Sequence, residues 1–240
     1  MKWALVTGAG KRLGRAVALH LKANGWGVVA HYNHSRAEAE QVSAQTAQGD
    51  LSDPNAAAPL IAAAREAAGG RLDALVNTAA IFEHDDIASL SAAALDKHMH
   101  INALAPALLA RAFAEGCDAD NRGAVVNFLD FKLASPYPDH FSYTLSKYAA
   151  AGAVDLLARA LAPNVRVNAV APGYILPAPD QSEEDYQRLH DDTPLNYGPT
   201  PEDIASAVRF LLENSAVTGQ TIYVDAGKRF RSYERDMAFM

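Results

Sequence analysis

The feature that most constrains the fold of this chain is a regular alternation of short apolar runs with segments of helical periodicity. Residues 2–7 form an apolar run, residues 15–24 carry apolar side chains at helical spacing, and residues 26–32 form a second apolar run. Gly25, directly after the helical segment, is typical of a helix C-terminus. A buried strand, a helix and a second buried strand within about 30 residues predict a right-handed unit of parallel strands.

The alternation continues along the chain. Further strands are predicted at residues 72–77, 124–129, 165–170 and 221–225, and helices at residues 35–45, 53–68, 90–117, 142–161 and 202–214. The segment 90–117 holds two helical runs joined near Ala105–Pro106, and a helix and a strand within residues 36–48 are both shortened. This pattern predicts an α/β fold with a doubly wound, Rossmann-type sheet of seven mostly parallel strands and helices on both faces.

Length and composition indicate one domain and exclude several kinds of partner. The 240 residues suit a single domain, 1–240, and residues 174–200, which lack periodicity, are expected to be an inserted substrate loop. A net charge of −7 argues against nucleic acid and anionic membranes as partners. Cys117 is the only cysteine, no Cys/His spacing indicates a metal site, and no apolar run reaches the ~18 residues of a membrane span. We expect a cytoplasmic protein.

A glycine-rich turn separates the first predicted strand from the first predicted helix. It reads Thr7-Gly8-Ala9-Gly10-Lys11-Arg12-Leu13-Gly14. Glycines let the backbone approach a pyrophosphate closely, and a helix N-terminus offers free N–H groups and a positive dipole end to an anion. A tight turn without a ligand is the alternative, but the position between strand and helix favours a phosphate site.

A tyrosine and a lysine lie four residues apart in the predicted helix 142–161. Tyr143 and Lys147 therefore share one face of that helix. An ammonium group beside a phenol favours the phenolate, so we expect the pKa of Tyr143 to lie below its usual ~10. An exposed pair without function is the alternative, which the preceding buried strand at 124–129 disfavours.

Together these motifs resemble those of the short-chain dehydrogenases/reductases, over residues 4–227. Arg12 replaces the usual glycine of the family, and Asp130 replaces the usual serine thirteen residues before Tyr143. Both changes are similar to the pteridine reductase and dihydromonapterin reductase branch. The resemblance implies that Asp130, Tyr143, Lys147 and Asn102 are catalytic, with Asn102 holding a water behind the lysine. A loop-capping role is the alternative for Asp130.

The end of the second predicted strand indicates which nicotinamide cofactor is bound. Folds that prefer NAD carry an acidic residue there, whereas this chain has none before Glu38. His34, Ser35 and Arg12 can donate to a 2′-phosphate, which favours NADPH over the alternative of a solvated polar turn. With the family resemblance, the predicted cofactor-binding residues are Gly8, Lys11, Arg12, Leu13, Asn33, His34, Ser35, Asp50, Leu51, Asn77, Ala79, Tyr143, Lys147, Pro172 and Gly173.

Phe82 resembles the aromatic residue that, in pteridine reductases, holds the pterin ring against the nicotinamide. The predicted substrate site consists of Arg12, Phe82, Asp130, Tyr143 and Tyr174. The resemblance implies an NADPH-dependent reductase that transfers hydride to the C=N bond of a dihydropterin, with Tyr143 or Asp130 supplying the proton. The alternatives are a carbonyl reductase of a keto or sugar-like substrate and a catalytically silent NADPH-sensing module. The resemblance also implies a homotetramer, and the basic tail after Gly227 is expected to pack on a neighbouring subunit.

Overall fold

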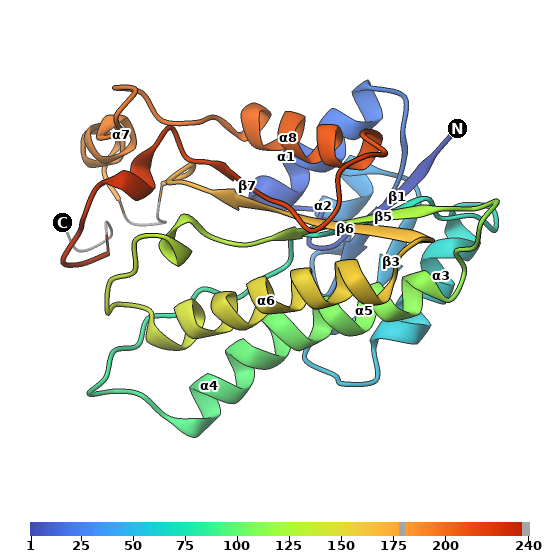
Figure 1. Cartoon of the computed structure of the whole chain (residues 1–240), viewed down its shortest axis with the longest axis horizontal. Coiled ribbons are helices and arrows are strands. Elements are labelled where there is room, and N and C mark those ends of the chain that lie inside the picture. The colour runs from blue at the N-terminus through green and yellow to red at the C-terminus, as the bar shows by residue number, and fades with distance from the viewer. Residues whose placement is uncertain (178–180, 237–240) are drawn as a thin grey trace.

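Seven strands form the centre of the molecule, in the order β3-β2-β1-β4-β5-β6-β7 (Figure 1). Every pairing between neighbouring strands is parallel. The structure, a computed structural model, describes residues 1–177 and 181–236. The predicted seven-stranded, doubly wound sheet is confirmed. The strands are β1 (Trp3–Val6), β2 (Gly27–Tyr32), β3 (Thr46–Gln48), β4 (Ala74–Asn77), β5 (Gly123–Phe128), β6 (Val165–Pro172) and β7 (Thr221–Val224).

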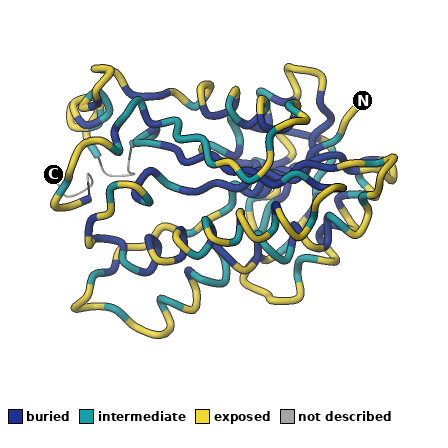
Figure 2. Tube along the Cα trace, viewed as in Figure 1, coloured by how far each residue is buried: buried dark blue, intermediate teal, exposed yellow. Residues whose placement is uncertain are grey.

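Helices cover both faces of the sheet, which explains why the central strands are mostly apolar on both faces. On one face lie α1 (Arg12–Ala23), α2 (Arg36–Val42) and α8 (Pro201–Glu213); on the other lie α3 (Ala57–Ala67), α5 (Ala105–Ala114) and α6 (Phe141–Ala160) (Figure 1). Leu5 and Val6 are adjacent in β1 and fully buried, yet they belong to opposite cores. Full burial of such a side chain is worth ~1.5–3 kcal/mol. Figure 2 shows this burial in the central strands of the sheet.

The helical region before β5 is interrupted where the sequence predicts a junction. Helix α4 (Ala92–Met99) continues into a π-helical turn, His100–Leu104, and then into α5. The predicted junction near Ala105–Pro106 is therefore confirmed, with Pro106 in the first turn of α5. Single π-helical turns are frequent at functional sites.

The segment 174–200 was expected to be a loop, but it contains a helix, so that expectation is wrong in part. Helix α7 (Glu183–Asp191) is capped at its N-terminus by Ser182, whose side chain accepts a hydrogen bond from the Asp185 amide at 3.1 Å. Leu189 is the one buried residue of this helix, which explains why no apolar period marks it in the sequence. Residues 178–180 of the predicted substrate loop, 174–200, lie outside the described residues.

The strand order reverses between β1 and β4, and this reversal sets the position of the functional site. In open parallel sheets, the crevice at such a reversal lies beyond the carboxyl ends of the strands. Thr7, Asn77, Leu129 and Gly173 all stand at or just after those ends. Among the described residues, no helix is long and apolar enough to cross a membrane.

Candidate active site

A cavity of about 640 Å³ lies at the carboxyl ends of the central strands. It brings together most residues that the sequence predicts for cofactor and substrate. Those that line it are Gly8, Lys11, Arg12, Leu13, Ala79, Phe82, Asp130, Tyr143, Lys147, Pro172, Gly173 and Tyr174. The predicted residues outside its lining are Asn33, His34, Ser35, Asp50, Leu51, Asn77 and Asn102.

The glycine-rich turn has the shape that a bound pyrophosphate needs. Gly8 has a positive φ of +65°, and a Cβ added to it would lie 3.3 Å from the Cα of Ala79. A Cβ on Gly14 would lie 2.4 Å from the carbonyl oxygen of Gly8, so no side chain fits there. Helix α1 has no side-chain cap and no acidic residue in its first turn, and it begins at the cavity wall. The residues present therefore fit a dinucleotide phosphate.

His31, which the sequence interpretation did not assign to the site, holds this turn in place. The imidazole is buried at the end of β2; Nδ1 accepts a hydrogen bond from the Gly8 amide at 3.1 Å, and Nε2 lies 3.0 Å from the carbonyl oxygen of Gly49. This pairing requires the neutral tautomer with a proton on Nε2. Burial lowers the pKa of His31, against a smaller opposing effect of the Gly49 carbonyl. A polar residue at the penultimate position of a strand that is otherwise apolar is the signal that could have identified it.

We expect His31→Leu to destabilise the fold by about 1–3 kcal/mol, because the Gly8 amide and the Gly49 carbonyl would lose their partner. His31→Gln can make both hydrogen bonds and is the matched control. The pKa of His31 is lower in the folded state than in the unfolded chain, where it is about 6.5. Below about pH 6.5 the unfolded chain therefore binds more protons at this residue, and the free energy of unfolding falls on acidification. Thermal melting between about pH 7 and pH 5 should show a smaller loss in His31→Gln than in the wild type. Equal melting temperatures of all three proteins would contradict this role.

Tyr143 and Asp130 form a direct hydrogen-bonded pair in the cavity. The Tyr143 hydroxyl donates to Oδ2 of Asp130 at 2.7 Å. Oδ1 of Asp130 accepts from the Lys132 amide at 2.9 Å, which caps the short 3₁₀ turn Phe131–Leu133. The carboxyl group thus has both the capping contact considered from the sequence and a contact with the tyrosine. These two interactions use different oxygens, so one does not preclude the other.

The lowered pKa expected for Tyr143 is wrong for this structure. Burial, and then the Asp130 carboxyl group, raise the pKa of Tyr143 well above its ordinary value. Lys147 donates instead to the carbonyl oxygen of Phe128 at 2.7 Å, and its Nζ lies 5.4 Å from the centre of the tyrosine ring. Burial also raises the pKa of Asp130 and lowers that of Lys147 to about 8. Tyr143 therefore retains its proton at neutral pH, as a proton donor must.

Asn102 lies in the π-helical turn and lines a small second cavity with Lys147. Its amide nitrogen donates to Ser146 Oγ at 3.0 Å, and its oxygen accepts from the Ile81 amide at 2.9 Å. The small cavity measures about 10 Å³, close to the size of one water molecule. Oδ1 of Asn77, which also lines it, is buried and has no hydrogen-bond partner within the described part of the chain. The site thus has the size and polarity to hold a single water beside Lys147.

Phe82 lines the same cavity as the glycine-rich turn, and one face of its ring is already covered. The ring of His140 stacks on it with centroids 3.9 Å apart, and the Tyr143 ring meets it edge-on at 4.7 Å. Phe82 remains 53% exposed, so it has surface available to stack against a flat ligand. His140 has a left-handed backbone (φ 57°) directly before α6 and lies 3.0 Å from the Glu83 carbonyl oxygen through Nδ1.

The structure does not bring Arg12 together with His34 and Ser35. The Arg12 guanidinium instead donates to the carbonyl oxygen of Pro177 at 3.3 Å, in the loop after β6, and so faces the substrate side. Lys11 turns toward α2, where its Nζ lies 3.4 Å from Glu38. His34 and Ser35 lie between β2 and α2, and Ser35 makes no side-chain cap.

Comparison with known proteins agrees with this geometry. A family model described as enoyl-(acyl carrier protein) reductase matches residues 8–229. Pteridine reductase 1 of Leishmania tarentolae is 34% identical, over 93% of this chain and 95% of that protein. The granaticin polyketide synthase putative ketoacyl reductase 2 of Streptomyces violaceoruber is 31% identical, over 93% of this chain and 94% of that protein. The crystal structure of FolM alternative dihydrofolate reductase 1 from Brucella suis in complex with NADP superposes with a TM-score of 0.91. The two sequences are 34% identical, and the match covers 97% of this chain and 96% of that chain.

Proposed function

This chain belongs to the short-chain dehydrogenase/reductase family, and from that premise we propose that it is an NADPH-dependent reductase of dihydropterin-type substrates. The observation that carries the proposal is the hydrogen bond between Tyr143 and Asp130 at 2.7 Å, inside a cavity that Phe82 also lines. A carboxyl group can accept from the ring N–H and amino donors of a pterin, and it can pass a proton to the tyrosine.

NADPH, when bound, supplies the hydride, and the residues of this chain orient the reactants and provide the proton. The glycine-rich turn and the start of α1 would hold the pyrophosphate, and Pro172 and Gly173 would hold the nicotinamide. Phe82 stacks on the pterin, and Tyr143 donates its phenolic proton to the substrate. Asp130 then returns a proton to the Tyr143 oxygen, which the 2.7 Å contact permits. Lys147 and a water in the small cavity that it lines with Asn102 would connect this pair to solvent.

A carbonyl reductase of a keto or sugar-like substrate is the second candidate, because a putative ketoacyl reductase is among the relatives. The two functions differ in the group that must be protonated, nitrogen in one case and oxygen in the other. NADPH consumption with a set of dihydropterins and a set of ketones tests the proposal directly. Turnover of ketones alone would refute it, and turnover of neither would favour a silent cofactor-binding module.

Cofactor preference gives a separate prediction. We expect kcat/KM to be higher with NADPH than with NADH, because the loop after β2 has no acidic residue to repel the 2′-phosphate. Asn33→Asp introduces a carboxylate of the same size directly after β2. It should lower kcat/KM for NADPH about tenfold or more, equivalent to ~1.4 kcal/mol. Asn33→Ala is the control and should keep the preference; a wild-type preference for NADH would contradict the assignment of His34 and Ser35.

We further propose a homotetramer that works in the cytoplasm. Apolar side chains on the outer surfaces of the π-helical turn and of α6 support an assembly through this face, since solvent-exposed apolar patches commonly mark interfaces. They are Leu104, Leu145, Tyr148 and Leu156, with 42–68% of each residue exposed. Light scattering of the purified protein gives the subunit number, and Leu156→Arg should lower it.

A further inference from the structure

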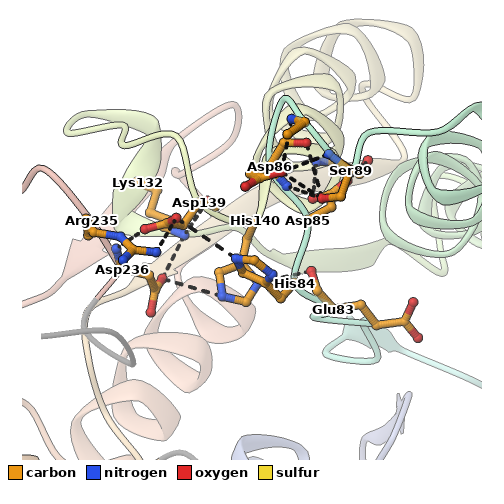
Figure 3. Close-up of polar contacts among 12 residues, drawn as sticks. Glu83, His84, Asp85, Asp86, Ser89, Lys132, Asp139, His140, Arg235 and Asp236 are labelled. Carbon is orange, nitrogen blue, oxygen red and sulfur yellow. Dashed lines mark hydrogen bonds and ion pairs between the residues drawn. The ribbon is translucent and has the colours of Figure 1, made fainter.

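The last described residues of the chain reach back to the candidate active site. After β7 and the short turn Lys228–Phe230, the chain returns to the loop before α6, where Asp236 lines the same cavity as Asp130 and Tyr143. The tail was expected to pack on a neighbouring subunit, and its described residues also contact the loop before α6 of their own chain (Figure 3).

Several polar contacts dock the tail on this loop. The Asp236 amide donates to Oδ2 of Asp139 at 2.7 Å, and the Arg235 guanidinium lies 3.4 Å from Oδ1 of the same carboxylate (Figure 3). Ser135 Oγ donates to the Arg231 carbonyl oxygen at 2.7 Å. Asp236 also lies 4.0 Å from Nε2 of His140, the residue that stacks on Phe82. The tail therefore has defined partners along the loop between the turn Phe131–Leu133 and α6.

The central contact is a buried ion pair between the tail and Lys132. Nζ of Lys132 lies 2.9 Å from Oδ2 of Asp236, and the two side chains are 2% and 9% exposed. The ammonium also lies 4.0 Å from the centre of the Tyr137 ring and donates to the Asp139 carbonyl oxygen at 3.4 Å. Removing two charges from water costs about as much as their attraction returns. Stability alone therefore does not explain an ion pair at this position.

Both members of the ion pair line the same cavity as the groups assigned to proton transfer, and Nζ of Lys132 lies 5.9 Å from the centre of the Tyr143 ring. The Lys132 ammonium is the largest favourable influence on ionised Asp130, ahead of Tyr143 and Lys147 on α6, and it opposes burial in setting the pKa of Asp130. Asp236 contributes to the raised pKa of Tyr143. Tyr137, which hydrogen-bonds Asp236, and Tyr174 and His140 also face the ion pair, and Tyr223 faces Asp130.

We propose that the C-terminal tail is part of the active site, where Asp236 positions the ammonium of Lys132 beside the Asp130–Tyr143 pair and so controls proton transfer to the substrate. Lys132 and Asp236 are positioning residues. The inference deepens the proposed function and rests on it for the role of Asp130 and Tyr143 as proton donors. It makes the tail a determinant of the pH range in which the enzyme works.

Charge removal at the two positions tests this proposal, because it should shift the titration of Asp130 in opposite directions. Lys132→Met removes the cation and should raise the apparent pKa of Asp130 by about 1, whereas Asp236→Asn leaves the cation unpaired and should lower it by a similar amount. Carboxyl ¹³C NMR of the full chain, without cofactor or substrate, measures both shifts, and Asp130→Asn assigns the signal. Arg231→Gln removes a tail cation outside the cavity and should leave the signal unchanged.

The double variant Lys132→Met/Asp236→Asn keeps the experiment decisive if a lone buried charge unfolds either single variant. It leaves neither charge unpaired and should titrate between the two single variants, with a melting temperature near that of the wild type. The pH profile of kcat/KM should move in the same directions as the NMR titration. An Asp130 titration that is unchanged in all these variants, or shifted equally by Arg231→Gln, would overturn the inference.

The NMR arm also separates this inference from the proposed function. If the wild type reduces no pterin but the opposite shifts are observed, the proposed function fails and the electrostatic coupling of the tail stands. If pterins are reduced and the shifts are absent, the proposed function stands and the role of the tail fails.

Discussion

Tyr143→Phe is expected to lower the rate of substrate reduction by about 10²–10⁴-fold, the usual contribution of a general acid. The change removes the hydroxyl that donates to Asp130 at 2.7 Å and leaves the ring. The edge-on contact with Phe82 should persist, so the shape of the cavity is kept. NADPH affinity should change little, because the phosphate-binding turn lies on other elements.

Single-turnover kinetics at a saturating NADPH concentration measure this effect, and quenching of protein fluorescence measures cofactor affinity. Tyr148→Phe is a matched control, since its hydroxyl lies on the same helix and donates to the Leu133 carbonyl oxygen at 3.1 Å, outside the cavity. It should retain normal turnover. A Tyr143→Phe variant with near-normal kcat would show that another group, with Asp130 the first to consider, protonates the substrate.

The sheet was predictable from the sequence because its strands are buried on both faces. Adjacent residues such as Leu5 and Val6 enter opposite cores, and this leaves an unbroken apolar run that is easily distinguished from helical periodicity. Helix α7 was missed for the opposite reason. It buries Leu189 alone, so its sequence carries no period, and the capping residue Ser182 was the one available signal.

Most residues that the sequence predicts for the site line one cavity, but their interactions were not predictable. The spacing of Tyr143 and Lys147 places them on one helix face, yet it gives neither the depth of burial nor the partner that each side chain chooses. Lys147 binds the Phe128 carbonyl and Tyr143 binds Asp130, so the pKa of the tyrosine rises where spacing alone suggested a fall. Arg12 likewise turns to Pro177, a contact between residues far apart in the chain.

Asp236 illustrates the limit of local patterns most clearly. Nothing near it in the sequence resembles a motif, and it reaches the cavity because β7 ends beside β6 and the tail folds back over the loop before α6. The partners of His31 are also distant in the chain, since it links the turn after β1 to the residue after β3 through hydrogen bonds to Gly8 and Gly49. Such contacts depend on the tertiary fold as a whole.

Asp130→Ser is expected to separate the two enzyme functions, because it restores the usual family residue but removes the carboxyl group. A ketone needs one proton on oxygen, which Tyr143 can donate beside a serine hydroxyl. A dihydropterin needs a proton on nitrogen and presents N–H donors that a carboxyl group accepts. Turnover of a dihydropterin should therefore fall by about 10²-fold or more, and turnover of any accepted ketone much less.

Stability measurements must accompany this variant, because Oδ1 of Asp130 caps the turn Phe131–Leu133. A serine hydroxyl can accept the same hydrogen bond from the Lys132 amide, so the cap is retained. Burial raises the pKa of Asp130 in the folded state above the value of about 3.9 in the unfolded chain. As the pH rises above about 3.9, the folded state therefore holds more protons at Asp130 than the unfolded chain, and the free energy of unfolding falls. The serine variant lacks this penalty, and its melting temperature at neutral pH should not fall below that of the wild type. Equal losses on both substrates with an intact fold would show that Asp130 serves proton transfer in general and has no specific role toward pterins.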